Sequence, residues 1–164
     1  MSSKRLVAIL AYPVINAFES VVDNYMRDTI SEPAIGSIVY CDLFLGYCEH
    51  SGIYIGNDEI IHLNKKGIIE KVDLKNFIKS TTALSIYASC IDSEAMGNQA
   101  IAQRALDFLL FSEQRNYHVI LDNCHQFTSS CITGNSENSD SFLWMLKHTA
   151  SKELSISNWR VWKR

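Results

Sequence analysis

The spacing of apolar residues changes from strand-like to helical near residue 97. Before it, short runs rich in β-branched and aromatic residues lie between turn-forming residues, which predicts strands. After it, apolar residues recur every three or four positions, which predicts helices. The predicted strands cover 38–41, 51–55, 60–63, 67–72 and 84–89, and the predicted helices cover 99–111, 124 to about 133, and 142–148. We therefore expect an α+β fold in which an antiparallel β-sheet packs against helices.

The length of 164 residues predicts a single domain. We expect residues 1–31 to form an N-terminal helical segment, since Pro33 breaks any helix, and 32–164 to form the domain, with a core at 36–134 and a C-terminal helix and tail at 135–164. The apolar run after Lys4-Arg5 resembles a secretory signal, but Pro13 interrupts it, and it is shorter than the roughly 20 residues that span a bilayer. A packed amphipathic helix is favoured, and an exported leader or a membrane contact through residues 1–20 stays open.

Charge and cysteine content narrow the classes of function. The chain has 15 Lys+Arg against 18 Asp+Glu, with no basic stretch beside aromatic residues, so nucleic acid is not an expected partner. The five cysteines show neither metal-ligand spacing nor a disulfide framework, which predicts reduced thiols in a cytoplasmic setting. Their positions are Cys41, Cys48, Cys90, Cys124 and Cys131.

A predicted hairpin at 51–63 carries two histidines, and the length of its turn decides which faces they occupy. Side chains alternate between faces along a strand, so a three-residue loop at 56–58 would place His50 and His62 on one face. A two-residue loop would place them on opposite faces. The three-residue loop gives one polar or small face and one apolar face, which favours it. The first face would hold His50, Gly52, Tyr54, Ile60, His62 and Asn64, and the second would hold Ile53, Ile55, Ile61 and Leu63.

Cys124 is the predicted nucleophile. Asp122 or Asn123 is suited to cap the following helix, which would place Cys124 in its first turn, where unpaired N–H groups favour a thiolate. That effect is about 0.3–1 kcal/mol, or up to about 2 when partly buried, and cannot by itself ionise a thiol with a pKa of about 8.5. We therefore expect an imidazolium nearby, with His50 as base and His62 fixing its tautomer. The Cys124 amide is the expected oxyanion donor.

Further residues near these positions are candidate site contacts. Tyr54 and Asn64 share the predicted histidine face, and Asn123 and His125 flank the cysteine. On a helix His125 points about 100° away from Cys124, so we expect it on the surface or against the substrate. The alternatives are an inert buried thiol and a structural pair of core histidines. A zinc site using both histidines and Cys124 lacks a fourth ligand, so no metal or other cofactor is expected.

Three strings together resemble the lecithin:retinol acyltransferase-like family: His50-Ser-Gly-Ile-Tyr-Ile-Gly56, Ile60-Ile61-His62-Leu63 and Asn123-Cys124-His-Gln-Phe127. The resemblance spans roughly 36–134 and implies a circularly permuted papain-like (NlpC-type) fold. In that family one histidine acts as base, a second orients it, and a cysteine accepts the acyl group; by resemblance these are His50, His62 and Cys124. The chain departs from the family at Ser37, where the family has Asp, and at His125-Gln126, where it has Glu-His. Because the printed C-terminal residues do not resemble the hydrophobic anchor of vertebrate members, we expect a soluble bacterial-type member to be the closer comparison.

The residue pattern predicts the class of reaction, and the resemblance implies the class of substrate. The residue pattern predicts acyl transfer or hydrolysis through a cysteine thioester. The resemblance implies that the partner is a small-molecule acyl donor such as a phospholipid ester. A cysteine amidase or peptidase acting on peptides, and a non-catalytic binding module of the same fold, are the alternatives.

Overall fold

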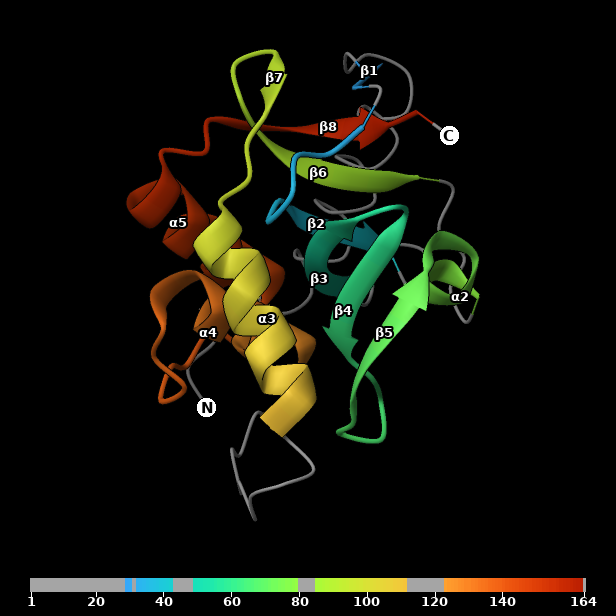
Figure 1. Cartoon of the computed structure of the whole chain (residues 1–164). Helices are drawn as coiled ribbons and strands as arrows, with labels where there is room; N and C mark the ends of the chain where they lie inside the picture. The colour runs from blue at the N-terminus through green and yellow to red at the C-terminus, as the bar shows by residue number, and fades with distance from the viewer. Residues whose placement is uncertain (1–28, 31, 43–48, 80–84, 112–122, 164) are drawn as a thin grey trace, which may run out of the picture.

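A computed structural model describes residues 29–30, 32–42, 49–79, 85–111 and 123–163 (Figure 1). Within these ranges the chain forms eight strands in one sheet and four helices. The strands are β1 (Thr29–Ile30), β2 (Ile38–Asp42), β3 (Glu49–Gly56), β4 (Glu59–Leu63), β5 (Ile69–Asp73), β6 (Ile86–Ile91), β7 (Glu94–Ala95) and β8 (Asn158–Trp162). The helices are α2 (Leu74–Ile78), α3 (Gln99–Phe111), α4 (Cys124–Thr133) and α5 (Leu143–Leu154).

The sheet has the order β1-β8-β6-β2-β3-β4-β5, and β7 pairs with β6. Its pairs are antiparallel except that β1 runs parallel to β8, so the sheet is mixed. The predicted α+β class is confirmed. The prediction that the whole sheet is antiparallel is wrong, because β1 and β8 are parallel. The predicted tail instead contains β8, whose Trp159 and Trp162 are buried. Thr29 and Ile30 form a strand where a helical segment was expected, and residues 1–28, including the predicted membrane contact, lie outside the described ranges.

Most predicted elements lie where the sequence pattern placed them. Helix α3 has the predicted bounds, and α4 ends at Gly134, whose left-handed backbone (φ 73°) suits glycine. Helix α5 continues to Leu154, six residues beyond its predicted end. Helix α2 was not predicted because its five residues give no repeating apolar pattern. No helix in the described part of the chain has the length and apolar character needed to span a bilayer.

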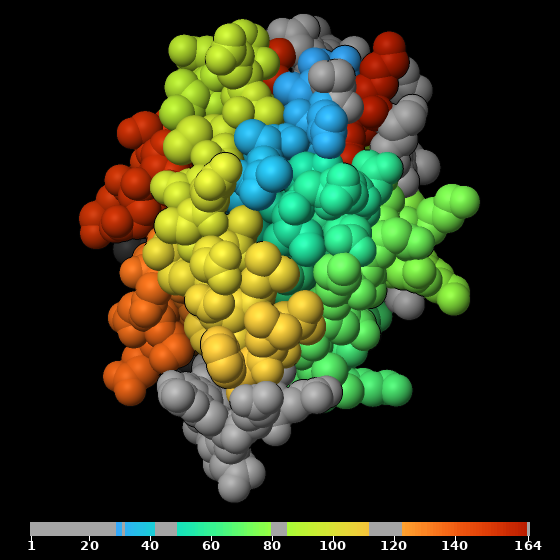
Figure 2. Space-filling model, viewed as in Figure 1, coloured from blue at the N-terminus to red at the C-terminus, as the bar shows by residue number. Residues whose placement is uncertain are grey.

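The two faces of the sheet pack against different partners. One face contacts α3, α4 and α5 (Figure 1). Ile53 and Ile61 of the hairpin lie in this core with Phe127 of α4. Helix α3 contacts the hairpin strands and lies beside them on the surface seen in Figure 2. The opposite face packs Tyr54 and Ile60 against Phe77 of α2. The hairpin is therefore buried on both sides, which lets it hold polar side chains in fixed positions.

Candidate active site

The β3–β4 hairpin turns through two residues, Asn57 and Asp58, so the predicted three-residue loop is wrong. Both residues have left-handed backbone (φ 53° and 59°), as a tight hairpin turn requires. The register then shifts at a bulge between Tyr54 and Gly56. The extra residue of the bulge offsets the shorter turn. Beyond it Ile53 pairs with Ile61, which is the predicted register, and both histidines share a face.

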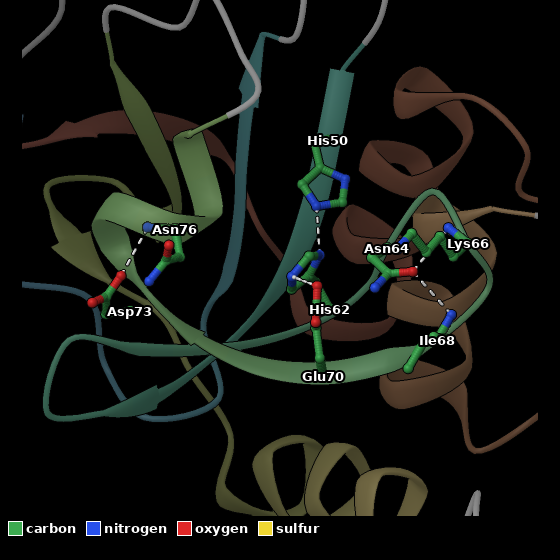
Figure 3. Close-up of polar contacts among 8 residues, drawn as sticks. All are labelled: His50, His62, Asn64, Lys66, Ile68, Glu70, Asp73 and Asn76. Carbon is green, nitrogen blue, oxygen red and sulfur yellow. Dashed lines mark hydrogen bonds and ion pairs between the residues drawn. The ribbon is translucent and has the colours of Figure 1, made fainter.

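A short hydrogen bond joins the two histidines. The Nε2 atom of His50 lies 2.6 Å from the Nδ1 atom of His62, and the rings meet edge to face with centroids 4.7 Å apart (Figure 3). Gly52 lies opposite His62, where an added Cβ would be 3.1 Å from the His62 Cβ. Glycine at this position therefore leaves room for the His62 side chain.

Two neighbours of the histidine pair were not predicted. Phe77 of α2 stacks on His50, with ring centroids 4.9 Å apart, and meets His62 edge-on at 5.5 Å. Glu70 of β5 pairs directly opposite His62, and its Oε1 lies 3.3 Å from the His62 Nε2. The β4–β5 register could have indicated Glu70, whereas the sequence gives no signal for Phe77 because α2 is so short.

Cys124 opens helix α4, as predicted, and Asn123 is the residue that caps it. The Asn123 Oδ1 accepts hydrogen bonds from the amides of His125 (2.9 Å) and Gln126 (3.1 Å). The Cys124 thiol is half-buried and lies 3.9 Å from the carbonyl oxygen of Glu49, to which it donates. Glu49 directly precedes His50 in β3. The thiol thus lies against the backbone of the segment that carries the predicted base.

Burial favours neutral groups at this site. It lowers the pKa of His50 to about 3, with smaller lowering by repulsion from His62 and His125, where these are protonated, and from Lys65. Burial also lowers the pKa of His62, although the Glu70 carboxylate opposes this. The pKa of the Cys124 thiol is raised by burial, against opposing hydrogen bonds from Ser51 and from first-turn amides. A preformed pair of thiolate and imidazolium is therefore not favoured in the free protein, because burial lowers the pKa values of the histidines and raises the pKa of the thiol.

His125 is buried, so its predicted surface position is wrong. Its Nδ1 is hydrogen-bonded to the Ser51 hydroxyl at 2.9 Å, and that hydroxyl also contacts Thr128 at 3.0 Å. Burial lowers the pKa of His125 to about 4. The reason for the error is that α4 is covered along its length, with every residue from 125 to 132 buried.

Tyr54 and Asn64 have structural contacts. The Tyr54 hydroxyl donates to Glu32 at 2.5 Å, and burial and this carboxylate raise its pKa to about 12. The Asn64 Oδ1 accepts hydrogen bonds from the amides of Lys66 and Ile68 at 2.9 and 3.1 Å, which shapes the β4–β5 turn (Figure 3). A role for either residue in the site stays a prediction.

The arrangement combines a thiol at a helix N-terminus with an oriented pair of imidazoles. Such a set suits proton transfer from a nucleophile. Within the described ranges no three His, Cys, Asp or Glu side chains are grouped so as to hold a metal ion.

Comparison with protein families gives a match to the model described as lecithin retinol acyltransferase over residues 31–137. The matched range includes His50, His62 and Cys124. Comparison with individual curated proteins gives no match.

Proposed function

Because the chain belongs to the lecithin retinol acyltransferase family, we propose that it transfers acyl groups from lipid esters through a thioester on Cys124. Family membership points to acyltransferase activity, and the cysteine chemistry and the lipid donor are our proposal. The observation that carries it is the 2.6 Å bond between His50 and His62, because His50 directly follows Glu49, whose carbonyl oxygen contacts the Cys124 thiol. A purely structural histidine pair would not require that the residue before His50 contact a thiol at a capped helix N-terminus.

In the first step His50 takes the proton of the Cys124 thiol as the sulfur attacks the ester carbonyl carbon. The carbon–oxygen bond to the alcohol then breaks, and His50 returns the proton to the departing alkoxide. The thioester and a lipid with a free hydroxyl are the products of this half-reaction. In the second half, an acceptor hydroxyl, amine or water gives its proton to His50 and attacks the thioester, and Cys124 regains its proton.

The neutral resting state fits this mechanism. The imidazolium exists only while negative charge is present on the sulfur or the carbonyl oxygen, and that charge stabilises it. The ring of His62 keeps His50 in one orientation through the transfer. A preformed ion pair is therefore not required.

We assign the oxyanion donor to the Cys124 amide. Asn123 accepts hydrogen bonds from the next three amides of the helix. Its Oδ1 accepts from His125 and Gln126, and its carbonyl oxygen accepts from Phe127. The Cys124 amide lies at the positive end of α4, beside the thiol, which suits it to a substrate oxygen.

Intact-mass measurement after incubation with phosphatidylcholine vesicles tests the proposal. We expect a mass increase of one acyl group in place of one hydrogen, located on Cys124 by peptide mapping and absent from Cys124→Ala. His50→Ala should slow its formation at least about 100-fold. His148→Ala, at an exposed position on α5, is the matched control and should react at the normal rate.

Two outcomes would count against the proposal. Equal turnover by wild type and Cys124→Ala would refute the cysteine mechanism. Faster acylation of Cys124 by peptide esters than by phospholipids would refute the lipid donor while leaving that mechanism in place.

A further inference from the structure

Glu70 lies at the far end of a line of side chains that leads from His50 through His62 (Figure 3). Strands β4 and β5 are antiparallel, and His62 pairs directly with Glu70, so the two side chains share a face. The His62 side chain is 7% exposed and that of Glu70 is 41% exposed. The carboxylate therefore connects the buried histidine pair to the surface.

The His62 Nε2 is buried and has no geometrically complete hydrogen bond within the described ranges. The Glu70 Oε1 at 3.3 Å is in ion-pair range, and rotation of this half-exposed side chain can complete a bond. A carboxylate only accepts hydrogen bonds. It therefore favours the tautomer of neutral His62 that carries its proton on Nε2.

Through the hydrogen bond between the rings, the tautomer of His62 determines the tautomer of His50. If the proton of His62 is on Nε2, its Nδ1 has a lone pair and can only accept. The 2.6 Å bond then requires that the His50 Nε2 carries a proton and donates it. Neutral His50 has one ring proton, so its Nδ1 is left with the lone pair. The lowered pKa values of both histidines support the neutral state of the rings.

We propose that Glu70 is a positioning residue that sets both tautomers and thereby makes Nδ1 the basic atom of His50. This inference rests on the proposed function for its catalytic meaning, because Nδ1 is then the atom that takes the proton of Cys124. The tautomers themselves are a property of the free protein. They can be measured without any substrate.

Two-bond ¹H–¹⁵N correlation spectra of the full chain at pH 7.5 report which ring nitrogens carry protons. In wild type we expect protonated Nε2 and bare Nδ1 on both His50 and His62. In Glu70→Ala and in the isosteric Glu70→Gln we expect His62 as a mixture of tautomers, because Ala offers no acceptor and Gln offers both an acceptor and a donor. Glu59→Ala removes a carboxylate of similar exposure on β4 that pairs with Lys71, and it should leave both tautomers unchanged.

The acylation rate gives the second measurement. We expect Glu70→Ala to lower kcat about tenfold with little change in KM, comparable to the smaller effects seen for residues that orient metal-bound histidines. Glu59→Ala should retain the wild-type rate. A proton on the His62 Nδ1 in wild type, or wild-type tautomers in both Glu70 variants, would overturn the inference even if the thioester forms. Failure of thioester formation with the expected tautomers would instead refute the proposed function and leave the role of Glu70 intact.

Discussion

Acidification is expected to destabilise the fold through its buried histidines. His50 and His125 are 8% and 5% exposed, and burial lowers their pKa values to about 3 and about 4 from 6.5. The folded state therefore binds fewer protons than the unfolded chain below pH 6.5. The contribution of these histidines to stability is fully present above pH 6.5. It is lost as the pH falls from about 6.5 toward their pKa values in the folded state.

The magnitude follows from the same numbers. At pH 5 each histidine of the unfolded chain is protonated, while its folded counterpart is largely neutral. One pKa unit corresponds to about 1.4 kcal/mol, and pH 5 lies 1.5 units below 6.5. Each histidine therefore lowers the free energy of unfolding by about 2 kcal/mol at pH 5. His50 and His125 together should lower the free energy of unfolding by about 4 kcal/mol between pH 7.5 and pH 5. That is a large part of the stability of an ordinary domain.

Urea unfolding followed by circular dichroism at several pH values measures this loss. His125→Asn keeps a polar atom near the position of Nδ1 for Ser51 and should remove about half of the pH dependence. His148→Gln, at an exposed position on α5, is the control and should keep the wild-type dependence. A free energy of unfolding that stays constant from pH 7.5 to pH 5, or an unchanged dependence in His125→Asn, would refute the reasoning.

Three further perturbations test the geometry of the site. Phe77→Ala should lower the free energy of unfolding by about 3 kcal/mol in thermal or urea melts, because Phe77 is 3% exposed and packs on both histidine rings. Gly52→Ala should cost about 1–3 kcal/mol in the same melts, since the added Cβ would lie 2.7 Å from Ile60 and 2.8 Å from the Ile61 carbonyl oxygen. Alkylation of Cys124 by iodoacetamide, followed by mass spectrometry, should accelerate steadily from pH 6 to pH 9, because burial raises the pKa of the thiol.

Each of these has a clear contrary result. A loss below about 1 kcal/mol for Phe77→Ala would show that the ring does not cover the histidines as described. Unchanged stability of Gly52→Ala would contradict the close approach of β3 and β4. An alkylation rate that is already maximal at pH 6 would reveal a preformed thiolate and imidazolium, against the neutral resting state.

The hairpin shows how far sequence reasoning reached. Alternation of polar or small residues with apolar ones is a local property, and it correctly placed His50 and His62 on one face. The turn length was wrong, because a three-residue loop and a two-residue turn with a bulge give the same register beyond Tyr54. Pattern alone cannot distinguish the two, and the bulge depends on how β3 and β4 twist together.

The sequence by itself determined the features that depend on neighbouring residues. These include the capped helix start that presents Cys124, the end of that helix at Gly134, and the strings that carry the family resemblance. The tertiary structure alone decided that His125 is buried and that Phe77 and Glu70 flank the histidine pair. It also decided that burial favours neutral histidines and a neutral thiol. The physical reason is that solvent exclusion and ring contacts arise between segments far apart in the chain, and no local pattern records which segments will meet.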